Sequence, residues 1–292
     1  METRDLGRES RESLPKASIH LEFFRHDDKA KAAEGQPDTT VRLTEKGRKH
    51  ASEVGKEKNP NPEVAVAFGS SRERSVETAM RQMLADQPEI GEDTTLEDIK
   101  ELVAGSVKVG RKDMVDERLN FVWDGEFKDA AMDHYVNKKD YLLFAVEESD
   151  DLVRKLKDHS STSYSRQAAG IAEIVRRYLE ILPNFQRLVA DNPDKYLKFQ
   201  NELQRFLGSH ATVTESFLMK VIEKTKGRDD VMKFIESLPD KNGFGFSEGF
   251  SLDLVGDETG TDIVLKYKDQ QWELTPELID EIIKDKEALD LT

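Results

Sequence analysis

The chain has 292 residues, no cysteine, and 59 acidic against 44 basic side chains, which gives a formal net charge of −15. The lack of cysteine excludes disulfides, thiolate catalysis and cysteine-based zinc sites, and the acidic balance disfavours nucleic acid and anionic membranes as partners. No apolar run reaches the roughly 18 residues that span a bilayer, and the first residues are charged where a signal peptide is apolar, so we expect a soluble, cytoplasmic protein.

Apolar strands alternate with helical segments along the N-terminal part of the chain. The expected elements are a loose polar tail at 1–16, a strand at 18–24, a helix at 45–58 capped by Thr44, a strand at 64–71 and a helix at 72–86. The stretch at 96–110 mixes apolar and polar residues and could hold a further strand. This order of elements is typical of βαβ units and predicts an α/β fold.

The rest of the chain is expected to be richer in helix, with a mainly helical insertion over about 111–201. The elements expected within and after it are a helix at 166–182, a strand at 203–210, a helix from a capping Thr212 to Gly227, two alternating strands at 250–255 and 262–268, and a helix from Pro276 onward. No internal repeat and no low-complexity tract interrupts this pattern.

Polar and charged side chains follow three of the expected strands. They are Arg25 and His26 after the first strand, Ser70, Ser71 and Arg74 after the second, and Ser209 and His210 after the third. Because the carboxyl ends of parallel strands meet at one edge of a sheet, these side chains should form a compact positive pocket. Guanidinium groups match phosphate oxygens in pairs and a neutral imidazole can attack phosphorus, so the pocket predicts a phosphoryl ligand.

Four short motifs, in the same order along the chain, resemble those of the histidine phosphatase superfamily, also called phosphoglycerate-mutase-like. They are FFRHDDK, LTEKG at 43–47, SSRERSVETA at 70–79 and LGSHATV, which together span Ile19 to about Ile222. The resemblance is looser between Gln87 and Gln200. It implies a divergent member of the family with a three-layer αβα sandwich, a mostly parallel central sheet and a helical insertion or cap, all in one domain over 17–292.

Carried onto this chain, the resemblance implies that His26 is the nucleophile that becomes phosphohistidine. Arg25, Arg74 and His210 would hold the phosphoryl oxygens and stabilise charge in the transition state. The implied activity is that of a phosphatase acting on a phosphorylated small molecule or a phosphoprotein, with neither metal nor cofactor. A mutase is less expected, because the longer mutase motif that begins Arg-His-Gly-x-Ser-x-x-Asn is missing.

Taken singly, the same residues have structural alternatives. Arg74 could pair with Glu77 on its own helix, and His210 could be a core or capping histidine. Ser70 and Ser71 could simply cap the helix that follows them. The remaining histidines lie outside the motifs and are expected to be structural or exposed: His20, His50, His134 and His159.

Two departures from the family pattern lie next to the motif residues. Asp27 stands where the family has glycine after the histidine, and Asp28 follows it, so two acids lie close to a site meant for an anion. They could turn outward or raise the basicity of His26. Arg72 stands where the family has proline, and could contact substrate or lie on the surface.

The general acid is the part of the mechanism that the motifs leave open. In ERLNFVWDGEF, Phe121 occupies the position at which the resemblance expects a glutamate. Asp124 is the first candidate to replace it, and Glu117 is the second; both could instead be solvated surface acids. If no acid acts, substrates with good leaving groups, such as phosphohistidine or acyl phosphates, are favoured. The alternative function is a weakly active or inactive relative that binds a phosphorylated ligand or partner.

Overall fold

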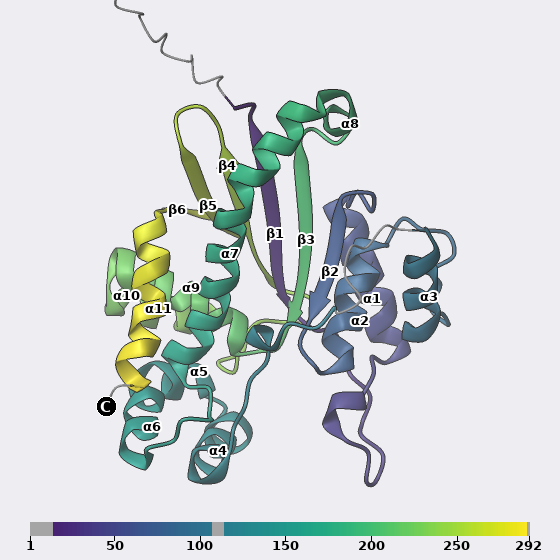
Figure 1. Ribbon diagram of the computed structural model, residues 1–292. Coiled ribbons are helices and arrows are strands. Elements are labelled where there is room, and N and C mark those ends of the chain that lie inside the picture. The colour runs from purple at the N-terminus through teal and green to yellow at the C-terminus, as the bar shows by residue number, and fades with distance from the viewer. Residues whose placement is uncertain (1–13, 107–113, 291–292) are drawn as a thin grey trace, which may run out of the picture.

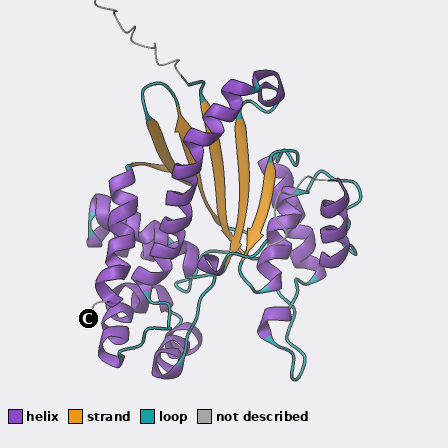
Figure 2. Ribbon diagram, in the orientation of Figure 1, coloured by secondary structure: helices purple, strands orange, loops and turns teal. Residues whose placement is uncertain are grey.

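The computed structural model describes residues 14–106 and 114–290, which form a six-stranded sheet with helices around it (Figures 1 and 2). The strand order is β2-β3-β1-β4-β5-β6. The strands are β1 (Ala17–Arg25), β2 (Ala65–Gly69), β3 (Glu202–Ser209), β4 (Gly249–Gly256), β5 (Thr261–Tyr267) and β6 (Gln270–Leu274). β1 and β3 therefore lie side by side although most of the chain separates them.

Helices make up most of the remaining structure. They are α1 (Glu45–Lys58), α2 (Glu73–Met83), α3 (Leu96–Ser106), α4 (Gly125–Met132), α5 (Tyr141–Phe144), α6 (Asp150–Leu156), α7 (Tyr164–Asp191), α8 (Pro193–Leu197), α9 (Val213–Lys226), α10 (Arg228–Ser237) and α11 (Pro276–Asp290). Short 3-10 turns occur at Asp38–Thr40 and Glu117–Leu119, and π-helical turns at Asp133–Lys138 and Ala145–Ser149. None of these helices has both the length and the apolar character that crossing a membrane would require.

The sheet is mixed, and its parallel part lies on the side of β2. β3 runs parallel to both of its neighbours, β1 and β2, whereas β4 is antiparallel to β1 and β5 is antiparallel to β4 and β6. The expectation of a mostly parallel sheet is wrong in this respect, because the C-terminal strands follow one another through short turns, which join antiparallel neighbours. The carboxyl ends of β1, β2 and β3 do meet at one edge.

Helices cover the parallel part of the sheet on both faces, as the expected three-layer sandwich requires. Neighbouring side chains of β1 point to opposite faces: Phe24 belongs to a core with α2 and α3, and Phe23 to a larger core with α7, α9 and α11. In Figure 1, α1 to α3 lie on one side of the strands and α7, α9 and α11 on the other. On β4 and β5 the face opposite the larger core carries charged side chains, among them Asp253 and Lys266.

Most of the expected elements are present, with three differences. Residues 96–106 form helix α3 rather than a strand, because Leu96, Ile99 and Val103 recur with helical spacing and are buried together. Thr212 precedes α9, but its side chain makes no capping hydrogen bond, and its φ is 81°. Helix α10 and strand β6 are additional elements. Residues 1–13 of the expected tail and 107–113 lie outside the described residues.

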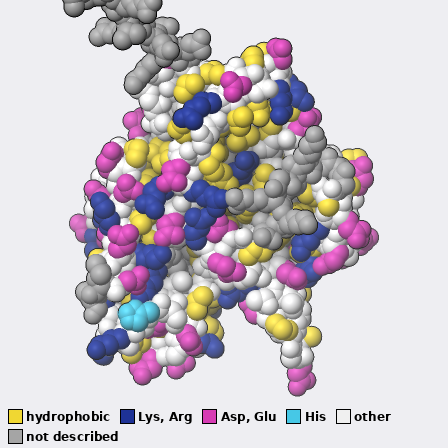
Figure 3. All heavy atoms as spheres, in the orientation of Figure 1, with side chains coloured by type: hydrophobic (Ala, Val, Ile, Leu, Met, Phe, Trp, Pro, Cys, Tyr) yellow, Lys and Arg dark blue, Asp and Glu magenta, His cyan; other side chains and the backbone are white. Residues whose placement is uncertain are grey.

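The described part of the expected insertion, residues 114–201, is mostly helical. Its longest helix, α7, packs against β1, β4, α9 and α11 and so belongs to the layer that covers the sheet. On the face of the molecule in Figure 3, acidic and basic side chains are interspersed, and hydrophobic side chains gather in the upper half of the view.

Candidate active site

The ends of three parallel strands bring His26, Ser70 and His210 together. His26 follows β1, Ser70 follows β2 and His210 follows β3, and the His26 backbone N–H donates to the Ser209 carbonyl at 2.8 Å. The imidazole rings of His26 and His210 lie with their centroids 5.1 Å apart in an edge-to-face arrangement. The convergence predicted from the strand ends is therefore present for both histidines.

The His26 ring is held in one orientation by its two nitrogens. Nδ1 lies 2.7 Å from the backbone oxygen of Asp27, which can only accept, so Nδ1 carries the hydrogen. Nε2 accepts from Nε of Arg74 at 3.2 Å. Burial, followed by the positive charge of Arg74, lowers the pKa of His26 from 6.5 to about 3. The imidazole is thus neutral, with a lone pair on Nε2.

Asp27 lies beside His26, but its carboxylate is turned away from the imidazole. Oδ2 lies 2.6 Å from Nδ1 of His50 and accepts from the Ser247 hydroxyl at 2.6 Å, while Oδ1 accepts from the Asp28 backbone N–H at 2.7 Å. Asp27 is almost fully buried. Its side chain therefore anchors the turn whose carbonyl oxygen orients His26. The pairing of His50 also agrees with a structural role for that histidine.

His210 is buried between the ends of β2 and β3. Its Nε2 lies 2.6 Å from the Ser70 hydroxyl, and its Nδ1 has no hydrogen-bond partner among the described residues. Burial, followed by electrostatic interaction with His26 and with the positively charged Arg74, holds the pKa of His210 well below its usual range. An unpaired polar nitrogen in a buried ring beside His26 is a free contact for a ligand. Ser70 thus bonds the second histidine, and the N-cap residue of α2 is Arg72.

Arg74 reaches across from the first turn of α2 to His26. Its Nη1 donates to the Asp38 backbone oxygen at 2.7 Å and its Nη2 to the Asp38 carboxylate at 2.9 Å. Glu77, the alternative partner, instead accepts from Nε of Arg81 at 3.2 Å. The interpretation of Arg74 as one half of an ion pair on its own helix is therefore wrong.

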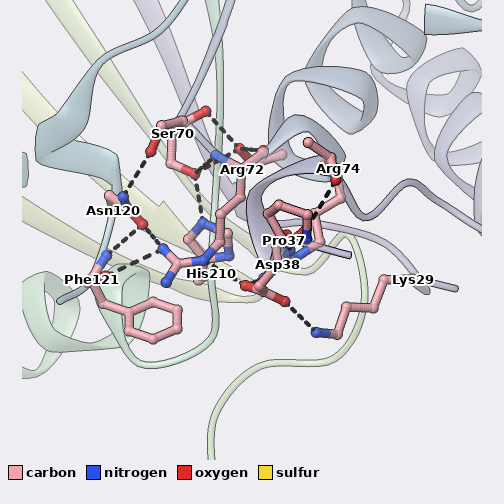
Figure 4. A network of polar contacts seen from close by, with 12 residues as sticks. Lys29, Pro37, Asp38, Ser70, Arg72, Arg74, Asn120, Phe121 and His210 are labelled. Atoms are coloured by element: carbon pink, nitrogen blue, oxygen red, sulfur yellow. Dashed lines mark hydrogen bonds and ion pairs between the residues drawn. The ribbon is translucent and has the colours of Figure 1, made fainter. Parts of the chain in front are cut away.

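Arg72 lies between Asp38 and Phe121, as Figure 4 shows. Its Nε donates to the Asp38 carboxylate at 2.9 Å, and the guanidinium carbon lies 4.1 Å from the centre of the Phe121 ring. Its Nη1 donates to the Phe121 carbonyl at 3.2 Å and also bonds the Asn120 side chain. Phe121 in turn contacts the His210 ring edge to face, with centroids 5.3 Å apart. Arg72 is therefore a site residue rather than a surface residue.

The side chain of Arg25 takes a different direction. Its guanidinium donates to the Phe244 carbonyl and lies 4.7 Å from the centre of the Phe246 ring, and its buried Nε has no partner among the described residues. Its charge lowers the pKa of His26, after burial and Arg74. Arg25 thus acts on His26 through its charge, and it is not hydrogen-bonded to that residue.

The two expected acids lie in different places. Asp124 is exposed and caps α4, accepting from the Gly125 N–H at 2.8 Å. Glu117 is also exposed, but its carboxylate accepts from the Ser71 hydroxyl at 3.2 Å and from the Asn120 amide at 3.0 Å. Glu117 is therefore linked to the rim of the site through neighbours of Ser70 and Phe121, and Asp124 is not.

A groove of about 950 Å³ lies between the sheet and helices α7 and α8, lined by Tyr178, Tyr196 and Arg205 among others. Glu117 lines it too, whereas His26, Arg74 and His210 do not. Within the part of the chain that the structure describes, no group of three or more histidine or acidic side chains is arranged to hold a metal ion.

Comparison with protein-family models and with curated proteins finds no match. Among solved structures, a mycobacterial glucosyl-3-phosphoglycerate phosphatase is similar with 16% identity and a TM-score of 0.42, over 87% of this chain and 98% of that chain. A phosphoglycerate mutase from Bacillus anthracis has 14% identity and a TM-score of 0.42, over 91% and 97%. A putative phosphohistidine phosphatase, SixA, from Agrobacterium tumefaciens has 13% identity and a TM-score of 0.32, over 82% and 91%. All three are histidine phosphatase superfamily members.

Proposed function

We propose that this protein is a metal-independent phosphatase that hydrolyses phosphomonoesters or phosphoproteins in the cytoplasm through a phosphohistidine on His26. The observation that supports this most directly is the state of that ring. Nδ1 is fixed on the Asp27 backbone oxygen, and the lone pair of Nε2 faces Arg74, with His210 beside it. A neutral, oriented imidazole next to fixed cations is what an attack on a phosphoryl group requires.

The reaction has two displacements at phosphorus. In the first, Nε2 of His26 forms a bond to phosphorus while the bond to the leaving oxygen breaks, and that oxygen takes a proton from an acid or from water. In the second, a water molecule attacks phosphorus, the nitrogen–phosphorus bond breaks and inorganic phosphate leaves. The positive charge on the phosphorylated ring is stabilised by the Asp27 carbonyl oxygen, which accepts its remaining N–H. Arg74 and His210 supply donors to the phosphoryl oxygens.

Hydrolysis of para-nitrophenyl phosphate in the presence of EDTA tests the proposal. We expect activity in the wild type, a loss of about a thousandfold or more in His26→Ala, and little change in His159→Ala, whose imidazole is exposed and outside the site. A ³²P-labelled substrate should leave label on the wild type that survives base and is lost in acid, and no label on His26→Ala. Activity that depends on a metal, or that persists in His26→Ala, would contradict the proposal.

A second candidate function is the binding of a phosphorylated ligand with little or no turnover. It is favoured by Phe121, which contacts His210 at the place where the resemblance expects an acid. In that case inorganic phosphate should bind the wild type, and para-nitrophenyl phosphate and acetyl phosphate should both remain intact. Turnover of acetyl phosphate alone would instead indicate a phosphatase that needs a good leaving group.

A further inference from the structure

The carboxylate of Asp38 lies where three cationic side chains converge (Figure 4). Lys29 donates to Oδ1 at 3.1 Å, and Arg72 and Arg74 each donate to Oδ2 at 2.9 Å. The side chain of Arg74 is 3% exposed, whereas that of Asp38 is 49% exposed. A buried guanidinium therefore points outward, and a residue of an outer loop supplies its anion.

The bonds to Asp38 occupy the donors that a phosphoryl group would need. Arg74 directs Nε to His26, Nη1 to the Asp38 backbone oxygen and Nη2 to the Asp38 carboxylate. Burial alone would raise the pKa of Asp38, but the hydrogen bonds from Arg74 and Arg72 outweigh it and lower that pKa strongly, so the group is an anion. A phosphoryl group on Nε2 of His26 would meet this negative charge next to it and compete for the same N–H groups.

The loop that carries Asp38 is attached to the site mainly through Asp38 itself. Residues 31–40 are all exposed, and the base of the loop is closed by the Lys29–Leu43 bridge and by a hydrogen bond from the Ala30 N–H to the Arg42 carbonyl at 2.9 Å. Within the described structure, the hydrogen bonds and ion pairs that tie 31–40 to Arg72 and α2 all come from Asp38. Releasing Asp38, through both its carboxylate and its backbone oxygen, would therefore free this loop from Arg72 and Arg74 without unfolding its base.

We propose that Lys29 and Arg72 bind the substrate's phosphoryl group together with Arg74, and that Asp38 occupies this position until the substrate displaces it. The ligand class is a tetrahedral phosphate dianion, whose three terminal oxygens can take the donors that two carboxylate oxygens now share. The inference rests on the phosphate site of the proposed function and adds two binding residues and an internal competitor to it.

Binding of inorganic phosphate, measured by isothermal titration calorimetry, tests this without turnover. In Asp38→Asn, which keeps the size and removes the charge, we expect phosphate to bind about tenfold more tightly than in the wild type, a difference of about 1.4 kcal/mol. Asp38→Ala should act in the same direction. Glu34→Gln is the matched control, because Glu34 is an exposed acid of the same loop whose carboxylate has no partner in the described structure; its affinity should stay at the wild-type value.

The binding residues are tested in the same way. Arg72→Gln and Lys29→Gln should each weaken phosphate binding, by about tenfold for Arg72, with thermal unfolding as the check that each variant is folded. Equal or weaker binding in both Asp38 variants would overturn the role of Asp38 as a competitor, and wild-type affinity in Arg72→Gln and Lys29→Gln would overturn their assignment. If His26→Ala abolishes turnover while these affinities do not change, this inference alone fails. If phosphate binds neither the wild type nor any of the variants, the phosphate site of the proposed function is itself refuted.

Discussion

The chemistry of His26 depends on backbone as much as on side chains. Nδ1 donates to the carbonyl of Asp27, and the carboxylate of that same residue is held by His50 and Ser247. The acid that stands where the resemblance expects glycine is tolerated here because its charge is paired away from the imidazole. The His26 imidazole is thus oriented by a turn that is itself held by the contacts of the Asp27 carboxylate.

Substrates with different leaving groups can show whether Glu117 or Asp124 acts as the general acid. Because Glu117 is linked to Ser71 and Asn120, we expect Glu117→Gln to lower kcat about a hundredfold for an alkyl phosphate, which needs a proton on its leaving oxygen. The loss should be small for para-nitrophenyl phosphate. Asp124→Asn, which changes a helix cap, should leave both rates near wild type. Equal rates for Glu117→Gln and wild type on both substrates would show that Glu117 is not the acid.

Sequence reasoning found the residues at the ends of strands and missed those on the outer loop. His26, Arg74 and His210 lie at strand or helix boundaries, where an apolar run stops on a polar residue, and the structure brings all three together. Lys29 and Asp38 carry no such signal, because they lie in a polar stretch without periodicity. Their contacts with Arg72 and Arg74 depend on how the loop folds back, which no local pattern predicts.

Helix α2 can bring Arg74 to the site because it lies very close to β3. Gly208 has no side chain, and a Cβ there would overlap the carbonyl oxygen of Ser75. Buried Ala79 of α2 lies against the same glycine. This close approach sets the distance between the first turn of α2 and the strand ends that carry the two histidines.

Gly208→Ala should therefore damage both stability and activity. We expect it to lower the free energy of unfolding by roughly 2–3 kcal/mol, because the backbone of α2 must shift to relieve the overlap, and to lower kcat/KM because Arg74 moves with it. Urea unfolding and para-nitrophenyl phosphate hydrolysis measure the two effects. The control is Gly91→Ala, where a Cβ would meet only the Thr94 hydroxyl at 3.7 Å. Equal stabilities for the two variants would show that the approach of α2 is not tight.

The helices and strands with a clear hydrophobic periodicity were predictable from the sequence. The way in which the strands pair was only partly predictable. The expected helix at 45–58 and its Thr44 cap agree with α1, and the apolar runs before His26 and His210 are β1 and β3. The mostly parallel sheet that the resemblance implied is wrong for β4, β5 and β6, because among the described strands only β1, β2 and β3 pair in parallel. Strand β6 is short, with apolar side chains only at Trp272 and Leu274 facing the core, which is too little for a reliable strand signal.

Across the whole molecule, buried histidines shape the response to pH. Chiefly because of burial, the pKa of His26 is lowered to about 3 and that of His210 is lowered as well. Below pH 6.5 these two histidines are therefore protonated in the unfolded chain but remain neutral in the folded protein. Their contribution to the free energy of unfolding falls as the pH drops from 6.5 toward 3. His20 acts at the other end: hydrogen bonds with Asp253 and Glu22 outweigh its burial and raise its pKa to about 10, so its stabilisation is complete below 6.5 and is lost as the pH rises through 10.

As the pH falls below 6.5, we expect His26 and His210 each to lower the free energy of unfolding by about 1.4 kcal/mol per pH unit. Between pH 6.5 and 5, His26→Asn should therefore lose roughly 2 kcal/mol less than the wild type. Urea unfolding at several pH values measures this, and the slope can be compared even if the substitution changes the stability at neutral pH. Parallel slopes for the two proteins would mean that His26 is not buried in its neutral form.

The position of β3 between β2 and β1 bears on how the protein is made. β1 and β2 are synthesised early, but they do not pair with each other. Both pair with β3, which begins at Glu202, so their places in the sheet can be taken only after β3 has been synthesised. Until then the nascent chain holds two apolar strands with open edges, a state in which aggregation competes with folding. His26 therefore cannot meet His210 until β3 has been synthesised, and a truncated product ending before Glu202 would be exposed to chaperones and proteases without the paired histidines.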